Sequence, residues 1–157
     1  MTVSMMRNGK RTTTAVLGLV AIAAGVIASP SRAHHSFAMY DQQQMKTLTG
    51  KLTRFIPGAN HAQLVFELVD ADGNPERNAD GGPLIWGAEM GSAAQIAAEG
   101  VTVKAFPEGT ILTVTINPLR DGRPFGAQAR GTALIKCGTE MPQDGCTEQT
   151  GEVFLDD

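Results

Sequence analysis

The stretch TILTVTINP, residues 110–118, carries the clearest secondary-structure signal in the chain. Its side chains alternate between two faces, one with Ile111, Thr113 and Thr115 and the other with Leu112, Val114 and Ile116. Alternation with this many β-branched residues is typical of a β-strand. We therefore expect a mainly β fold organised around this segment.

Three further strand candidates precede this segment. TLTGKLTRF (47–55) and HAQLVFELVD (61–70) are rich in β-branched and aromatic residues, and LIWGAEM (84–90) is a third candidate. In the second of them, one predicted face carries Ala62, Leu64, Phe66 and Leu68. Residues 70–83 are rich in Gly, Pro, Asn and Asp, so they predict a long hairpin loop. A calcium loop is disfavoured there because no Glu follows at the twelfth position.

One segment has helical character. GSAAQIAAEG (91–100) offers Ser92 as an N-cap, Gln95 three residues later, and a glycine stop at Gly100. After the strand at 110–118, residues 120–126 predict a turn, 129–136 a fifth strand and 151–155 a short additional strand.

This order of elements favours one architecture. Three strands, a short helix and two more strands are the order of an OB-fold, a small five-stranded barrel with its helix between the third and fourth strands. A small β-sandwich is the alternative.

Residues 1–33 resemble a secretory signal peptide. A basic start with Arg7, Lys10 and Arg11 precedes an apolar run over 15–28, and small residues lead to a cleavage site after Ala33. The alternative is an uncleaved membrane anchor, but the apolar run is shorter than the about 20 residues that a spanning helix needs. We expect a mature single domain over 34–157, periplasmic or secreted, with no stable membrane span after cleavage.

Cleavage would also change the charge. The leader holds four of the 13 basic residues and none of the 16 acidic ones, so the mature chain has a formal charge of −7. Nucleic-acid binding needs clustered Lys and Arg, so nucleic acid is not an expected partner.

The two cysteines lie close together in CGTEMPQDGC, residues 137–146. In an exported protein an isolated pair across a short loop predicts a structural disulfide between Cys137 and Cys146. A thioredoxin-type site has only two residues between its cysteines, and a cysteine metal site needs further ligands nearby in sequence.

Two of the three histidines, His34 and His35, would begin the mature chain. A leading histidine offers its amine and its ring nitrogen to one metal ion, and one further imidazole would complete a three-nitrogen set suited to Cu(II). We expect His61 to supply that imidazole, with His35 as substitute or support. Two interpretations stay open beside this one: incidental copper binding by an exposed His-His start, and no metal role at all.

The remaining residues favour binding over catalysis. No nucleophile–base spacing is recognisable, so we do not expect an enzyme. The alternative function is a metal-independent OB-like module that binds an unknown small ligand or periplasmic protein. Its candidate ligand face carries Phe66 and Trp86.

Several motifs together resemble a known family. AHHSFAMYD, TGKLTRF, NHAQLVFELVDADG, WGAEMGS and FPEGTILTVTINPLRDGRPFGA are similar to motifs of small exported bacterial proteins classed as a domain of unknown function. The resemblance covers roughly residues 34–135 and implies export and a small β-domain, but no activity. This chain departs from the family pattern at Asn60, which is followed directly by His61 without the usual proline, and has a longer loop over 71–83 and a longer tail from Cys137.

Overall fold

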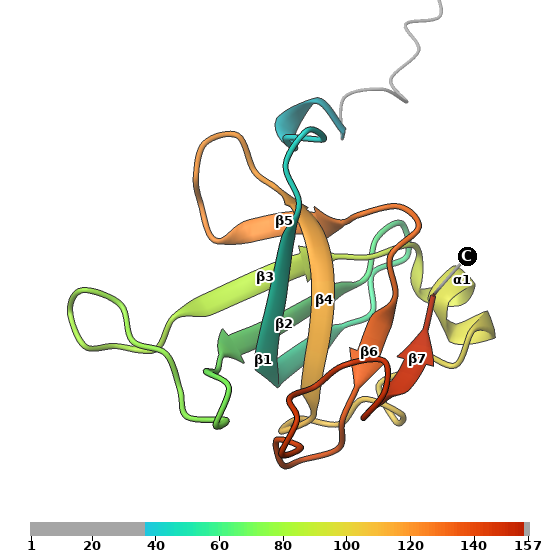
Figure 1. Ribbon diagram of the computed structural model, residues 1–157. Coiled ribbons are helices and arrows are strands. Elements are labelled where there is room, and N and C mark those ends of the chain that lie inside the picture. The colour runs from blue at the N-terminus through green and yellow to red at the C-terminus, as the bar shows by residue number, and fades with distance from the viewer. Residues whose placement is uncertain (1–36, 156–157) are drawn as a thin grey trace, which may run out of the picture. The chain divides into compact units, whose positions relative to one another are not determined.

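The structure, a computed structural model, describes residues 37–155, and their strands form a closed barrel (Figure 1). The barrel strands are β1 (Lys46–Ile56), β2 (Gln63–Leu68), β3 (Ile85–Glu89), β4 (Ile111–Pro118) and β5 (Phe125–Gln128). They follow the order β1-β2-β3-β5-β4, and β4 pairs with β1 to close the ring. Of these pairs, β3–β5 is parallel and the others are antiparallel. The predicted mainly β, OB-like barrel is therefore confirmed.

The barrel interior is filled by the side chains that the alternation predicts. In β2 and just before it, Ala62, Leu64 and Phe66 are 0% exposed and Leu68 is 7% exposed. Complete burial of an aliphatic or aromatic side chain of this size contributes roughly 1.5–3 kcal/mol each. The β4 segment 111–114 is buried on both faces because the C-terminal part of the chain covers its outer side.

Helix α1 (Ala93–Ala98) lies between β3 and β4, as predicted. The Ser92 hydroxyl accepts a hydrogen bond from Gln95 N at 3.2 Å, which makes Ser92 the N-cap. Gly100 ends the segment with φ +88°, a conformation that glycine adopts without strain. Ile96 is 2% exposed and packs into the barrel core.

The predicted position of the fifth strand is wrong. The strand that closes the barrel is β5 (Phe125–Gln128), which begins inside the predicted turn 120–126, and the predicted strand 129–136 contains only the short strand β6 (Leu134–Lys136). A turn separates the two strands because Thr132 Oγ1 donates to Ala129 O at 2.7 Å and Gly131 has φ +67°. Gly126 allows β5 to approach β4 closely. A Cβ at this position would lie 2.6 Å from Asn117 O, so no larger residue fits.

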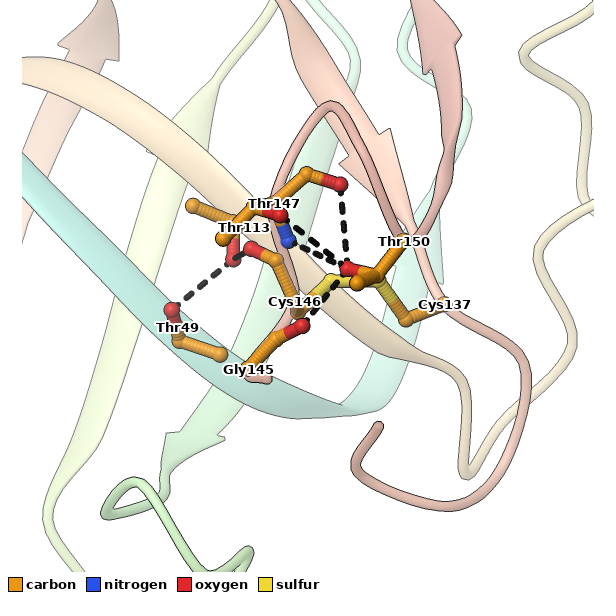
Figure 2. Close-up of a disulfide and its surroundings, with 7 residues drawn as sticks. All are labelled: Thr49, Thr113, Cys137, Gly145, Cys146, Thr147 and Thr150. Atoms are coloured by element: carbon orange, nitrogen blue, oxygen red, sulfur yellow. Dashed lines mark hydrogen bonds between the residues drawn. A yellow bond between two sulfur atoms is a disulfide. The ribbon is translucent and has the colours of Figure 1, made fainter. Parts of the chain in front are cut away.

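Two short strands extend the sheet beyond the barrel. β6 pairs with β4, and β7 (Glu152–Phe154) pairs with β6 within the predicted segment 151–155. The predicted disulfide joins Cys137 to Cys146 in the loop between them, with a Cα–Cα distance of 5.7 Å. Figure 2 shows how this loop is held on the barrel: Thr113 Oγ1 donates to Cys146 O at 2.8 Å, and Thr49 Oγ1 lies 2.8 Å from the same hydroxyl.

The segment between β2 and β3 is the predicted hairpin loop, in green in Figure 1. Isolated bridges Val69–Pro75 and Arg77–Pro83 continue the hairpin beyond the strands. Asp70 Oδ1 accepts hydrogen bonds from the backbone of Asn74 at 2.8 Å and Asp72 at 3.0 Å. These bonds, chiefly the one from Asn74, hold the pKa of Asp70 below its usual range.

Candidate functional site

A pocket of about 460 Å³ opens where the end of β3, helix α1 and the β5–β6 turn meet the start of the described chain. Its lining includes Phe37, His61, Glu89, Gln95, Gln128 and Arg130. The pocket therefore combines an aromatic ring, an imidazole, a carboxylate, two amides and a guanidinium.

His61 is held at the rim of this pocket by the β2–β3 hairpin. Two backbone hydrogen bonds flank it on the C-terminal side: Ala62 N donates to Gly91 O at 2.9 Å, and Met90 N donates to Ala62 O at 2.8 Å. They continue the β2–β3 pairing past the last residue of β3, where Gln63 lies opposite Glu89. The His61 side chain is 42% exposed, so its ring is accessible from outside.

Glu89 is the nearest acidic partner of His61. Its Oε1 lies 3.5 Å from His61 Nδ1, and its side chain is only 19% exposed. The Glu89 carboxylate also interacts with the phenol of Tyr40 and helps to raise its pKa. A single carboxylate thus contacts one buried and one exposed side chain.

Tyr40 is 2% exposed and is protonated at all ordinary pH values. Burial, followed by the charge of Glu89 and the hydrogen bond to it, raises the pKa of the Tyr40 phenol well above its usual value. The phenol therefore stays neutral beside the charged Glu89 carboxylate.

The same tyrosine fastens the start of the described chain to the barrel. The short helix η2 (Phe37–Met39) leads into Tyr40, which bridges to Leu119 after the end of β4. Asp41 N donates to Pro118 O at 2.8 Å, and Arg120 N donates to Met39 O at 3.0 Å. These contacts place Phe37 in the pocket lining together with His61.

Arg130 faces the same pocket from the β5–β6 turn. Its guanidinium carbon lies 5.6 Å from the centre of the Phe37 ring, a cation–π distance. Among residues 37–155 no carboxylate lies within 4 Å of Arg130.

The predicted metal ligands are divided between described and undescribed residues. His61 lies at the pocket, whereas His34 and His35 lie outside the described residues. Within residues 37–155, no three His, Cys, Asp or Glu side chains are grouped as a metal site. Over the same range no helix is long and apolar enough to cross a membrane.

The candidate ligand face is only partly exposed. Phe66 and Trp86 lie opposite each other in the β2–β3 register, but Phe66 is 0% exposed and belongs to the barrel core. The Trp86 ring is partly buried and lies 5.3 Å from Lys46 Nζ. Phe66 therefore contributes packing, and only Trp86 retains accessible surface.

A second hollow, of about 510 Å³, lies between the outer face of β1 and β4 and the disulfide loop. Its floor includes Thr49 and Thr113, whose hydroxyls already bond to each other and to Cys146 O. Because these hydroxyls are satisfied within the chain, this hollow offers little polar recognition.

Sequence analysis did not identify Glu89 or Arg130 as site residues. Alternation within 84–90 puts Glu89 on the opposite face from Trp86. In an antiparallel hairpin, the end of the second strand lies beside the start of the first. Pairing 84–90 with 61–70 could therefore have suggested that Glu89 lies beside His61. Arg130 carried no such signal, because its place depends on a turn that was predicted as strand.

A comparison with family models matches residues 21–128 to the Family of unknown function (DUF6152). The chain belongs to the DUF6152 family. This match confirms the resemblance to a family of unknown function, and it assigns no activity. The DUF6152 match ends at the last residue of β5, so β6, β7 and the disulfide loop lie beyond it. No curated protein and no solved structure matches the chain.

Proposed function

We propose that the protein is exported, that its mature chain begins at His34, and that it binds Cu(II) through the His34 amine and ring together with His61. His35 offers a substitute nitrogen. The disulfide supports export, because such bonds persist in oxidising compartments.

The observation that carries this proposal is the shared position of Phe37 and His61. Both residues line one pocket, and Phe37 follows His34 by three residues. Three residues of chain span at most about 11 Å, so a mature N-terminus at His34 would lie within about that distance of Phe37.

The chemistry of these groups suits copper. An α-amine and an imidazole have ordinary pKa values of about 7.7–8.0 and 6.5, so both lose their protons readily near neutral pH. Copper binds nitrogen ligands more tightly than the other divalent first-row metals. A mature N-terminal histidine would offer two such nitrogens in one chelate.

The test is a Cu(II) titration of three chains: one beginning at His34, the same chain with its α-amine acetylated, and His61→Ala. We expect both changes to weaken binding and alter the EPR spectrum, whereas His35→Ala, the matched control, has a smaller effect. Equal affinity and spectrum in the acetylated chain would remove the amine from the site. An unchanged His61→Ala would exclude His61.

The pocket itself favours a second candidate function, metal-independent binding of a small ligand. Its volume suits a small molecule, and Arg130, Gln95 and Gln128 supply polar groups to orient one. Thermal-shift screening of metal-free protein with small organic acids would test this. Stabilisation that Arg130→Ala removes supports the ligand; stabilisation that persists in Arg130→Ala would locate binding elsewhere.

A further inference from the structure

We propose that the hollow between the disulfide loop and the outer face of β1 and β4 binds an aliphatic cation, a small molecule with a hydrocarbon chain and an ammonium group. This hollow shares no lining residue with the pocket of His61. The inference therefore goes beyond the proposed copper site and does not depend on it.

The inner surface of the hollow is apolar. Val69, Ile135 and Cys146 line it and are buried, so their positions are fixed by the surrounding chain. The hydroxyls of Thr49 and Thr113 lie 2.8 Å apart and bond to each other, so neither needs a partner from a ligand. The volume, about 510 Å³, is in the range of small-molecule sites. A hydrocarbon chain would gain free energy by leaving water for this surface.

The outer wall of the hollow is already formed without a ligand (Figure 2). The disulfide closes the loop, and Thr113 Oγ1 donates to Cys146 O at 2.8 Å. Within the loop, Thr150 Oγ1 donates to Gly145 O at 2.6 Å and accepts from Thr147 N at 2.9 Å. A ligand would therefore not have to order this wall when it binds.

The charged residues of the lining are all acidic. Asp70 and Glu148 are exposed and therefore lie at the rim, and among the described lining residues there is no Lys or Arg. The backbone N–H groups of Asn74 and Asp72 fix the Asp70 carboxylate and hold its pKa below the usual range. An ionised rim above an apolar floor favours a ligand that is cationic at one end, and it repels an anion.

The first experiment compares ligands that share one chain length and differ in charge. Binding of octylammonium, octanol and octyl sulfate is measured by calorimetry on metal-free protein near neutral pH, below the micelle concentrations. We expect the affinity to fall in that order, and the difference between the first two to shrink as salt is added. Octyl sulfate that binds as tightly as octylammonium would overturn the proposal.

The apolar floor predicts a dependence on chain length. Each methylene group that leaves water should strengthen binding roughly two- to fourfold, so hexylammonium should bind more weakly than octylammonium. Equal affinity of the two amines would show that only the carboxylates are recognised, and it would overturn the role of the hollow.

The rim carboxylates are tested one at a time. Glu148→Gln and Asp70→Asn each remove a charge, and asparagine keeps an acceptor oxygen for the loop backbone. Each should weaken octylammonium binding about 1.5–5-fold and leave octanol binding unchanged. Glu140→Gln is the matched control, because Glu140 is an exposed glutamate of the same loop outside the lining. An equal loss in the control, or no loss in either rim variant, would contradict the assigned rim.

Methyl NMR of the methionines locates the bound ligand. Met141 lines the proposed hollow, whereas Met90 lines the pocket of His61. We expect octylammonium to shift the Met141 methyl signal to saturation and to leave the Met90 signal in place, in the unaltered protein and in His61→Ala. A shift of Met90 without a shift of Met141 would place binding in the other pocket and overturn the proposal. No metal enters these measurements, so their failure would leave the copper proposal untouched.

Discussion

At the scale of single residues, Tyr40 connects the N-terminal segment to the rest of the molecule. It is the only tyrosine in the chain, it is buried, and the Glu89 carboxylate helps to raise the pKa of its phenol. Because there is no other phenol, every optical measurement of tyrosine ionisation reports on this one contact.

Tyrosine ionisation should therefore be coupled to unfolding. The pKa of Tyr40 is raised in the folded protein, so its stabilising contribution is complete below the ordinary tyrosine pKa of about 10 and is lost as pH rises above it. In an alkaline titration followed by ultraviolet absorbance, we expect folded protein to ionise well above pH 10 and urea-unfolded protein near pH 10. Ionisation near pH 10 in both states would contradict the buried contact.

A glycine also decides packing at this scale. A Cβ on Gly50 would lie 2.5 Å from Phe66 Cδ2 and 2.7 Å from Glu67 O, so β1 can approach β2 here only without a side chain. Gly50→Ala should lower the free energy of unfolding by about 1–3 kcal/mol, measured in urea. Gly82→Ala, where the nearest atom belongs to the Asn78 side chain, is the control and should cost less. Equal effects would show that β1 shifts to accommodate the methyl group.

The sequence was enough to predict the position of a side chain where that position depends only on its own strand. The buried face of Ala62, Leu64, Phe66 and Leu68 follows from alternation within one strand. Glu89 was missed because its contacts with His61 and Tyr40 depend on strand pairing and on a segment 49 positions earlier in the chain, information that no local pattern contains.

At the scale of elements, helix α1 shows how a short segment is defined by its ends. Six residues cannot form a stable helix alone, so the Ser92 cap and the burial of Ile96 determine its stability. Ser92, Gln95 and Gly100 are all local signals, and the helix was predicted from them.

Ser92→Ala should therefore destabilise the protein by about 1 kcal/mol, because it leaves a helical N–H without its acceptor. The measurement is urea unfolding followed by circular dichroism. Ser92→Asp is the matched control, since aspartate also accepts at an N-cap, and it should retain most of the stability. An equal loss in both variants would argue against a capping role.

Strand β5 shows where local patterns were insufficient. Its four residues, FGAQ, contain two small residues and no β-branched one, so only Phe125 favours a strand. It forms because both neighbours, β3 and β4, offer backbone groups to it, and Gly126 allows close approach to β4. Pairing across the barrel, not intrinsic preference, makes this element.

At the scale of the whole described molecule, the closed barrel and the C-terminal disulfide loop contribute to stability in different ways. Barrel closure depends on β1–β4 pairing, whereas the loop covers the outer face of β4 through Thr113. The order of elements was enough to predict the barrel, because few topologies accommodate that order.

We therefore expect the barrel to survive loss of the disulfide. Cys137→Ala with Cys146→Ala opens a ring whose ends lie nine positions apart, which should lower the free energy of unfolding by about 2–3 kcal/mol. Circular dichroism should remain that of a β-barrel, with one cooperative transition. Thr113→Val removes the hydrogen bonds of Thr113 to Cys146 O and to Thr49 but keeps the ring, and it should cost about 1–3 kcal/mol. An unfolded double variant would show that the loop is required for the barrel.

Native mass spectrometry of the protein recovered from the exported fraction of copper-supplemented cells tests the central claim most directly. We predict a chain that begins at His34, is two hydrogen atoms lighter than its reduced form, and carries one copper ion that His61→Ala does not retain. A chain that begins elsewhere, or one that begins at His34 without copper, would contradict the account.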